Sequence, residues 1–246
     1  MSGRIDVHSH LIPGIDDGCA NLEQSITCAR MLVDAGFTHA FCTPHVWTNL
    51  PENTPASIVR RTAELQAHFD AAGVALRVLP GGELSLGPEI VNMTAPDVVT
   101  YAMGGKFCLF DLWADELPDF FEAAVRHLQS LGLKLVLAHP ERMKAAQDDP
   151  GTVERMQELG LLLQGNLQCF SDPEDWATRR TAVKFLLDRR YTFLATDTHR
   201  PDSLPQRMHG LRRAIELAGH EEVTRLSVEN PRLLLDAAGA RGQGSD

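Results

Sequence analysis

The sequence predicts an α/β protein built around parallel strands, and three observations support this prediction. Short apolar runs rich in β-forming residues alternate with helical stretches along the 246 residues, an order that is typical of parallel sheets. Several runs, among them FCLF, KLVLA and LLLQ, are almost continuously apolar, as strands covered by helices on both faces are. The chain length is also common for α/β barrels that fold as one domain.

Seven strands are expected from these runs. Their approximate ranges are Arg4–Val7, Thr38–Thr43, Ala75–Leu79, Lys106–Leu112, Lys134–Ala138, Gly160–Gly165 and Tyr191–Thr196. The longest irregular stretch, Pro80–Gly105, is expected to be an active-site loop that contains a helical turn. No linker or repeat divides the chain, so residues 1–238 should form a single domain, followed by a disordered Gly-rich tail, residues 239–246.

The helix after the first strand has the clearest pattern. Apolar residues recur at helical spacing from Leu22 to Val33. Asn21 can cap its start, Gln24 completes a pattern like a capping box, and Gly36 fits its end. Further helices are expected at Pro55–Ala72, Leu117–Leu131, Gly151–Leu159, Asp175–Arg190, Leu204–Ala218 and His220–Leu226, with a last apolar turn at Leu233–Leu235.

Composition excludes several classes of function. The 23 Lys and Arg residues against 33 Asp and Glu residues give a formal charge of −10, which argues against a surface that neutralises nucleic-acid phosphates. No run of 18 apolar residues predicts a membrane span, and the first strand begins too early for a signal peptide. The five cysteines are scattered, which suits buried thiols in a reducing cytoplasm, so a cytoplasmic location is expected.

Side chains typical of metal and catalytic sites lie at the carboxyl ends of all seven predicted strands. They are His8 and His10, His45, Glu83, Asp111, His139, Asn166, and Asp197 with His199. In barrels of parallel strands this rim carries the active site. Taken alone, Asp111 and Asn166 are more simply explained as structural residues. The other histidines, His39, His68, His127, His209 and His220, are expected to be structural or solvent-facing.

With Asp17 from the IDDG segment, the set contains five imidazoles and three carboxylates, which are too many for one ion. Nitrogen and oxygen ligands without thiolate suit manganese, iron or zinc. Two or three clustered ions suit hydrolysis of a phosphate ester, because one activates water and the others neutralise phosphoryl oxygens. Arg142 could hold the phosphate with a bidentate fork, and Arg200 is a weaker candidate for the same role.

These residues resemble the PHP superfamily, and within it the metal-dependent bacterial tyrosine-protein phosphatases of capsule and exopolysaccharide operons. The similar segments are IDVHSHLIPGIDDG, the TPH that ends at His45, the GGE that ends at Glu83, AHPER, the GN before Leu167, ATDTH and ENPRLLL. They cover nearly the whole chain, and the DDG and AHPER segments are specific to this branch. The resemblance implies a distorted seven-stranded (β/α)7 barrel, similar to a TIM barrel, with a centre of up to three ions, usually manganese.

The resemblance also implies a role for each of these residues. One metal would be held by His8, His10, Glu83 and Asp197, a second by His45, Glu83 and His139, and a third by Asp17 and His199. Arg142, His139 and Asp197 are expected to act in catalysis, with Arg142 on the phosphate. Asp6 would orient a ligand imidazole, and Asp16 receives no role.

The implied activity is hydrolysis of phosphotyrosine on a tyrosine kinase or related protein of capsule or exopolysaccharide biosynthesis. A hydroxide that the metals activate would attack phosphorus directly, and the phenolate, with a pKa near ~10, would leave without a strong general acid. This sequence departs from the family at one position. The family carries a second phosphate-binding arginine, but the equivalent position here falls near Leu204. Arg200 and Arg207 are the alternatives for it.

The sequence disfavours several other functions. A cysteine-dependent phosphatase needs Cys followed six positions later by Arg, and an amidohydrolase needs a bridging Lys at the active rim; neither is present. A small-molecule phosphatase of the histidinol-phosphate type shares the chemistry and is the nearest alternative. A nuclease is disfavoured by the acidic balance, and a non-catalytic, metal-stabilised scaffold that binds a kinase is disfavoured by the intact ligand set. The sequence is compatible with a homo-oligomer.

Overall fold

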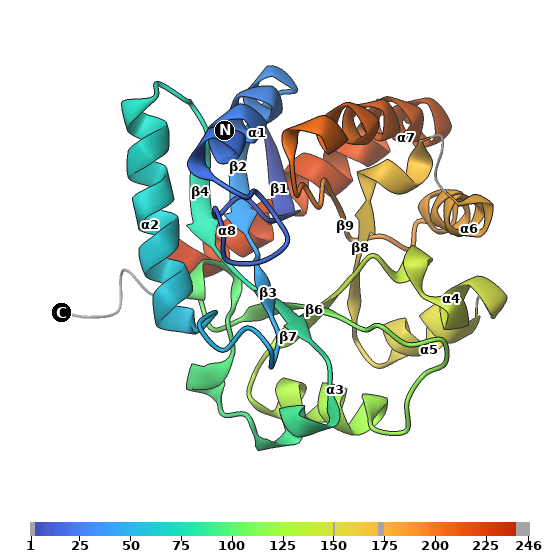
Figure 1. Ribbon diagram of the computed structural model, residues 1–246. Coiled ribbons are helices and arrows are strands. Elements are labelled where there is room, and N and C mark those ends of the chain that lie inside the picture. The colour runs from blue at the N-terminus through green and yellow to red at the C-terminus, as the bar shows by residue number, and fades with distance from the viewer. Residues whose placement is uncertain (1–2, 150, 172–174, 240–246) are drawn as a thin grey trace.

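All nine strands of the part that the structure describes pair in parallel, and the helices lie outside them (Figure 1). The structure is a computed structural model that describes residues 3–149, 151–171 and 175–239. Its strands are β1 Arg4–Ser9, β2 Phe37–Cys42, β3 His45–Val46, β4 Arg77–Pro80, β5 Glu83–Ser85, β6 Phe107–Asp111, β7 Lys134–Ala138, β8 Leu162–Asn166 and β9 Phe193–Ala195. The parallel α/β class predicted from the sequence is therefore confirmed.

The strands form two sheets, of order β1-β2-β4 and β3-β5-β6-β7-β8-β9. The second and third predicted strands correspond to β2 and β4. The chain then continues into β3 and β5, which were not predicted and which belong to the other sheet. Pro44, which has no amide proton, and the Gly81-Gly82 pair interrupt the ladders at these points. The hydrogen-bonded strands therefore do not form a single closed sheet of seven strands. A parallel bridge between Ser9 and Thr198 nevertheless joins β1 to the segment after β9.

The helices agree with the sequence pattern where caps and periodicity were both clear. Their bounds are α1 Leu22–Asp34, α2 Pro55–Ala71, α3 Phe121–Ser130, α4 Lys144–Asp148, α5 Gly151–Glu158, α6 Trp176–Leu187, α7 Leu204–Thr224 and α8 Arg232–Gly239. Asn21 caps α1 by accepting from the Gln24 amide at 3.0 Å. The Gln24 side chain accepts from the Ala20 amide, one residue earlier than a capping box requires.

The helices differ from the predicted ones at four places. α3 starts later than Leu117, because a residue before proline disfavours helical backbone. The two predicted helices on either side of Gly219 are joined in α7, with Gly219 at φ 85° interrupting them. α4 was not predicted, since its five residues are too few to show a period. The predicted last turn is the longer helix α8, which ends at Gly239, and the rest of the expected disordered tail lies outside the described residues.

The space that the strands enclose is filled with apolar side chains, so a packed hydrophobic core lies beneath the carboxyl-terminal rim. This inner core includes Ile5, Val7, Phe41, Phe107, Leu109, Val136 and Phe193, and Leu234 of α8 packs against it. A larger core lies between the strands and the surrounding helices. The five cysteines are buried and free, as the scattered spacing predicted. Among the described helices, none is long and apolar enough to cross a bilayer.

Candidate metal centre

The side chains predicted at the carboxyl ends of the strands gather around Glu83, which begins β5. Its Oε1 lies 3.0 Å from Nε2 of His139, the residue after β7. Its Oε2 lies 2.9 Å from Nδ1 of His45 and 3.3 Å from Nε2 of His8. Glu83 is fully buried, so one carboxylate lies close to imidazoles from β1, from the start of β3 and from the residue after β7.

Asp197, which follows β9, closes the other side of the cluster. Its Oδ1 lies 3.4 Å from His8 Nε2, 3.5 Å from His10 Nε2 and 3.4 Å from His199 Nδ1. Asp197 and His139 both have left-handed backbone, with φ of 51° and 34°. This conformation is unfavourable for residues with a side chain and is typically kept where function needs the side chain in one place.

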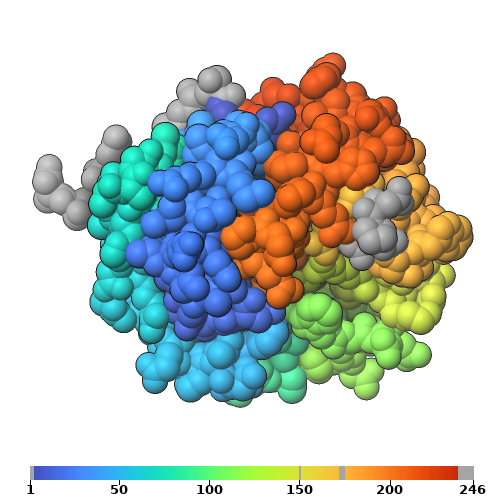
Figure 2. Space-filling model, turned by 45° about the horizontal axis from the view of Figure 1, so that its top comes forward, coloured from blue at the N-terminus to red at the C-terminus, as the bar shows by residue number. Residues whose placement is uncertain are grey.

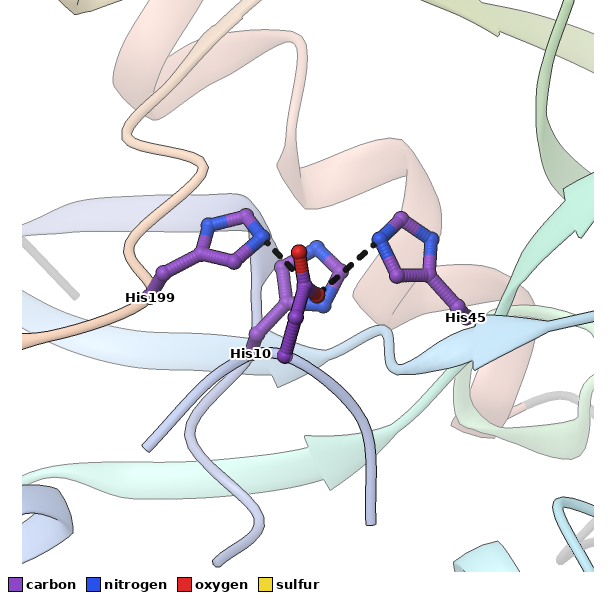
Figure 3. Close-up of side chains that lie close together, drawn as sticks. His10, His45 and His199 are labelled. Atoms are coloured by element: carbon purple, nitrogen blue, oxygen red, sulfur yellow. Dashed lines mark ion pairs between the residues drawn. The ribbon is translucent and has the colours of Figure 1, made fainter. Parts of the chain in front are cut away.

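The outermost part of the cluster is formed around Asp17. Its Oδ1 lies 3.3 Å from His45 Nε2 and 3.4 Å from His199 Nε2, and the dashed lines in Figure 3 mark these two ion pairs. The imidazoles of His10, His45 and His199 turn toward this carboxylate from three segments of the chain (Figure 3). The Asp17 side chain is 65% exposed and that of His199 19%, so this part opens to solvent.

Two buried atoms at the centre lack the hydrogen bonds that burial normally demands. His45 Nδ1 and Glu83 Oε2 lie 2.9 Å apart, yet neither makes a hydrogen bond, and Asp111 Oδ1 also makes none. A cation shared between nitrogen and carboxylate lone pairs would satisfy such atoms. Within the described residues, four overlapping groups could each hold an ion: His10, Asp17, His45 and His199; His8, His10 and Asp197; His8, Glu83 and His139; and His45, Glu83 and Asp111.

A buried chain of hydrogen bonds fixes the tautomer of His8. The Asp197 carboxylate can only accept, so Asn166 Nδ2 donates to its Oδ2 at 2.7 Å. The Asn166 carbonyl then accepts from Gln164 Nε2 at 2.7 Å, which turns Gln164 Oε1 toward His8 Nδ1 at 2.8 Å. His8 therefore carries its proton on Nδ1, and its Nε2 lone pair faces the centre of the cluster.

Asp16 orients His10 in the same way. Its Oδ2 accepts from His10 Nδ1 at 2.7 Å and from the His45 amide at 3.0 Å, while Oδ1 accepts from the Gly18 amide at 3.0 Å. A Cβ on Gly18 would lie 2.4 Å from the His10 carbonyl oxygen, so the segment after Asp17 needs glycine there. Sequence reasoning gave Asp16 no role, although its place in a DDG segment beside Asp17 was a usable signal.

Asp6 does not orient an imidazole, which corrects the role implied by the resemblance. It shares a strand face with His8 and His10, but it lies deeper. Its carboxylate accepts from the Thr196 amide at 2.9 Å and from the Thr196 hydroxyl, and so joins β1 to the end of β9. Burial raises the pKa of Asp6 to about 6.

The charges of the cluster depend on one another. Burial disfavours a charged imidazole at His8, but Glu83 and Asp197 outweigh burial and raise the pKa of His8. Burial likewise opposes charge on His45, yet its contacts with Asp17 and Glu83 raise its pKa to about 9. Burial also opposes charge on Glu83, and the surrounding imidazoles, His8 first, hold its pKa well below the usual value. These carboxylates therefore demand positive charge, from protons or from metal ions.

Asp111, at the end of β6, joins the cluster although its sequence pattern favoured a structural role. It is fully buried, and burial together with the charge of Glu83 raises its pKa to about 7. Its Oδ2 accepts from the indole Nε1 of Trp113, and its Oδ1 belongs to the group with His45 and Glu83. Asn166, also expected to be structural, contacts Asp197 as described above.

The three candidate arginines differ in their surroundings. Arg142 lies in the short turn after His139, and its Nη1 donates to Asp197 Oδ2 at 3.2 Å, beside the cluster. The Arg200 side chain is 65% exposed, and its Nε lies 3.7 Å from Asp202. These contacts place Arg142 at the cluster and Arg200 on the surface after it.

Arg207 does not face the cluster with its donors. It is buried on α7, and it donates through Nε to the Thr196 carbonyl at 2.6 Å and through Nη2 to the Asp197 carbonyl at 2.6 Å. Its Nη1 donates to the Ser203 carbonyl at 3.1 Å. These bonds hold the chain around Asp197, so the structure does not support Arg207 as a phosphate ligand.

The remaining histidines stay apart from the cluster, as expected. His39 lies on β2 beside Thr38, and His127 on α3 contacts the Met93 carbonyl at 2.8 Å. Neither these two nor His68, His209 or His220 belong to the possible metal-binding groups found among the described residues.

Comparisons with known proteins agree with this geometry. The sequence pattern of the capsular polysaccharide synthesis family CpsB/CapC matches residues 4–236. The chain is 25% identical to tyrosine-protein phosphatase YwqE of Bacillus subtilis over 94% of this chain and 91% of that protein. It is also 25% identical to tyrosine-protein phosphatase CpsB of Streptococcus agalactiae, over 94% of this chain and 98% of that one.

A solved structure is similar over almost the whole length. It belongs to a study of YwqE from Bacillus subtilis and CpsB from Streptococcus pneumoniae, described there as unique metal-dependent tyrosine phosphatases. The TM-score is 0.86 at 25% identity, and the match covers 95% of this chain and 94% of the other.

Proposed function

The chain belongs to the CpsB/CapC family of capsular polysaccharide synthesis, and on that premise we propose that it is a metal-dependent protein-tyrosine phosphatase. The observation that carries the proposal is the buried cluster of imidazoles and carboxylates around Glu83, with unsatisfied lone pairs at its centre. When bound there, metal ions supply an activated hydroxide and neutralise the oxygens of a phosphoryl group. Manganese is the proposed metal, and iron and zinc suit the same ligands.

The proposed ligands follow from the groups of donor atoms. His8, His10 and Asp197 would hold one ion, and His8 and His139 would share a second with Glu83, whose two oxygens point to different neighbours. Asp17, His45 and His199 would hold the outermost ion, and Asp111 would add a carboxylate beside Glu83. This set contains all eight ligands expected from the sequence.

Residues around the proposed ligands orient the imidazoles and bind the phosphate in the proposed reaction. Gln164 and Asp16 keep protons on the Nδ1 atoms of His8 and His10, so that the Nε2 lone pairs stay directed inward. Arg142 binds the phosphate next to Asp197, where its guanidinium offers several donors to phosphoryl oxygens. The buried cysteines lie outside this set, which agrees with direct hydrolysis rather than a cysteine nucleophile.

The substrate in the cell is proposed to be a phosphotyrosine protein of capsule or exopolysaccharide synthesis, such as a tyrosine kinase. A cytoplasmic location, a single domain for residues 1–238 and a distorted barrel are part of the same proposal. The barrel is supported by the bridge between Ser9 and Thr198, which brings β1 beside the segment after β9.

The related alternative is a phosphatase of the histidinol-phosphate type, and a substrate comparison tests the proposal against it. Protein loaded with manganese should hydrolyse a phosphotyrosine peptide faster than a phosphoserine peptide of the same sequence or histidinol phosphate. Preferential turnover of histidinol phosphate would overturn the protein-phosphatase assignment. A complete lack of turnover on all three would favour a non-catalytic scaffold.

A further inference from the structure

Trp113 stands exposed at the entrance to the metal centre. Its side chain belongs to the segment directly after β6, two residues beyond Asp111, and the residue is 66% exposed. The green segment around residues 110–120 meets the blue N-terminal segment and the orange segment near residue 200 on the face shown in Figure 2. The Trp113 ring centroid lies 6.0 Å from that of His139, so this indole is close to the cluster.

Although it is exposed, the indole is held in place. Its Nε1 donates to Asp111 Oδ2, which uses the one polar atom of the ring and leaves the faces free for apolar contact. An exposed tryptophan alone has no functional meaning, and Trp176 on α6 is equally exposed. Trp113 differs because a buried carboxylate of the cluster fixes its ring.

Trp113 forms a wall of two hollows beside the centre. One, of about 500 Å³, is also lined by His139, Arg142, Met143 and Lys144. The other, of about 470 Å³, is lined mainly by apolar side chains, among them Trp47, Leu84, Ile90 and Met93. Both volumes fall in the range of sites that bind organic groups.

We propose that Trp113 is the specificity-determining residue that binds the aromatic ring of the phosphotyrosine substrate in the hollow shared with Arg142. This inference rests on the proposed phosphatase function. A phosphate held at Arg142 beside the cluster would have its ester group in the same hollow, against the exposed indole. Stacking of two aromatic rings stabilises the complex beyond area burial alone, which an alkyl phosphate ester could not gain. The hollow thereby selects aryl over alkyl phosphates.

Two substitutions separate the ring from its hydrogen bond. Trp113→Gln keeps an N–H donor for Asp111 but removes the ring, whereas Trp113→Phe keeps a ring and removes the donor. Trp176→Gln is the matched control, because that indole has similar exposure and stacks on Arg180 at 4.6 Å. Bound metal is measured in each variant, so that a loss of metal is recognised.

The readout is competitive inhibition by phenylphosphonate, methylphosphonate and inorganic phosphate in the manganese-loaded protein. In Trp113→Gln the inhibition constant for phenylphosphonate should rise about tenfold relative to the other two anions, while Trp113→Phe and Trp176→Gln should keep the original ratio. A purely structural role for Trp113 would weaken all three anions together. An unchanged ratio in Trp113→Gln would overturn this inference and leave the phosphatase assignment intact, whereas the absence of phosphotyrosine turnover by the unchanged protein would remove the assignment itself.

Discussion

The inner and outer parts of the proposed metal centre are built in different ways. His8, Glu83 and His139 are buried, lie on or directly after strands, and receive their orientation from neighbouring strands. Asp17 and His199 lie in loops, and their side chains are 65% and 19% exposed. The inner part is therefore a rigid site in a low-dielectric surrounding, and the outer part is a site open to water and salt.

This difference predicts different metal affinities within one cluster. Attraction between a cation and a buried carboxylate is screened little, while solvent weakens the same attraction at an exposed carboxylate. The inner positions should therefore keep their ions during dilution, and the outermost ion should exchange first. Substitutions on the two sides should consequently differ in size of effect.

The largest effect is expected for Glu83→Gln. The change preserves shape but removes the charge that faces His8, His45 and His139, so two metal positions are weakened at once. Turnover of a phosphotyrosine peptide should fall at least about a thousandfold, which corresponds to roughly 4 kcal/mol of lost transition-state stabilisation. Kinetics and metal analysis of the purified variant measure both losses.

Glu222→Gln is the matched control for this change. Glu222 is also buried, but it pairs with Arg189 and Arg225 near the C-terminal end of α7 and belongs to none of the possible metal-binding groups found among the described residues. It should retain both metal and turnover. If Glu83→Gln kept its full metal content and turnover, the proposal that Glu83 is a metal ligand needed for catalysis would be contradicted.

A smaller effect is expected for Asp17→Asn. The variant should lose the most weakly held ion while keeping the inner ones, and its turnover should fall by about ten- to a hundredfold. Excess manganese should restore much of the activity, because an exposed ligand contributes less to affinity than a buried one. The dependence of rate on manganese concentration is the measurement, and Asp188→Asn, an exposed carboxylate at the C-terminal end of α6, is the control.

Equal losses in the two variants would contradict the comparison between inner and outer parts. The same holds for an Asp17→Asn protein whose activity is insensitive to added manganese. In either case the cluster would act as one indivisible unit, despite the difference in exposure of its members.

The sequence allowed prediction of the residues that follow each apolar run, because such runs are local features of the sequence. His8, His45, Glu83 and His139 each follow an apolar run, and parallel strands bring such ends to one rim. The positioning residues could not be found that way. Gln164 contacts His8 across 156 positions of the chain, and a glutamine inside a predicted strand carries no local mark of that contact.

Other differences have equally physical causes. After the breaks at Pro44 and Gly81 the chain forms two further short strands, β3 and β5, which pair in the second sheet, and such pairing depends on partners distant in the sequence. Arg207 has the right residue type and neighbourhood for a phosphate ligand, but its helix directs it to backbone carbonyls around Asp197. Residue type and spacing therefore predicted where charge gathers, while the direction of each side chain required the fold.

The central claim, that phosphotyrosine hydrolysis depends on metal in this cluster, is tested most directly by restoring metal to stripped protein. Chelator-treated protein is titrated with manganese while bound metal per chain and hydrolysis of a phosphotyrosine peptide are followed together. The rate should be negligible without metal, rise as the centre fills, and disappear again on chelation. Full turnover by protein free of bound metal would contradict the claim.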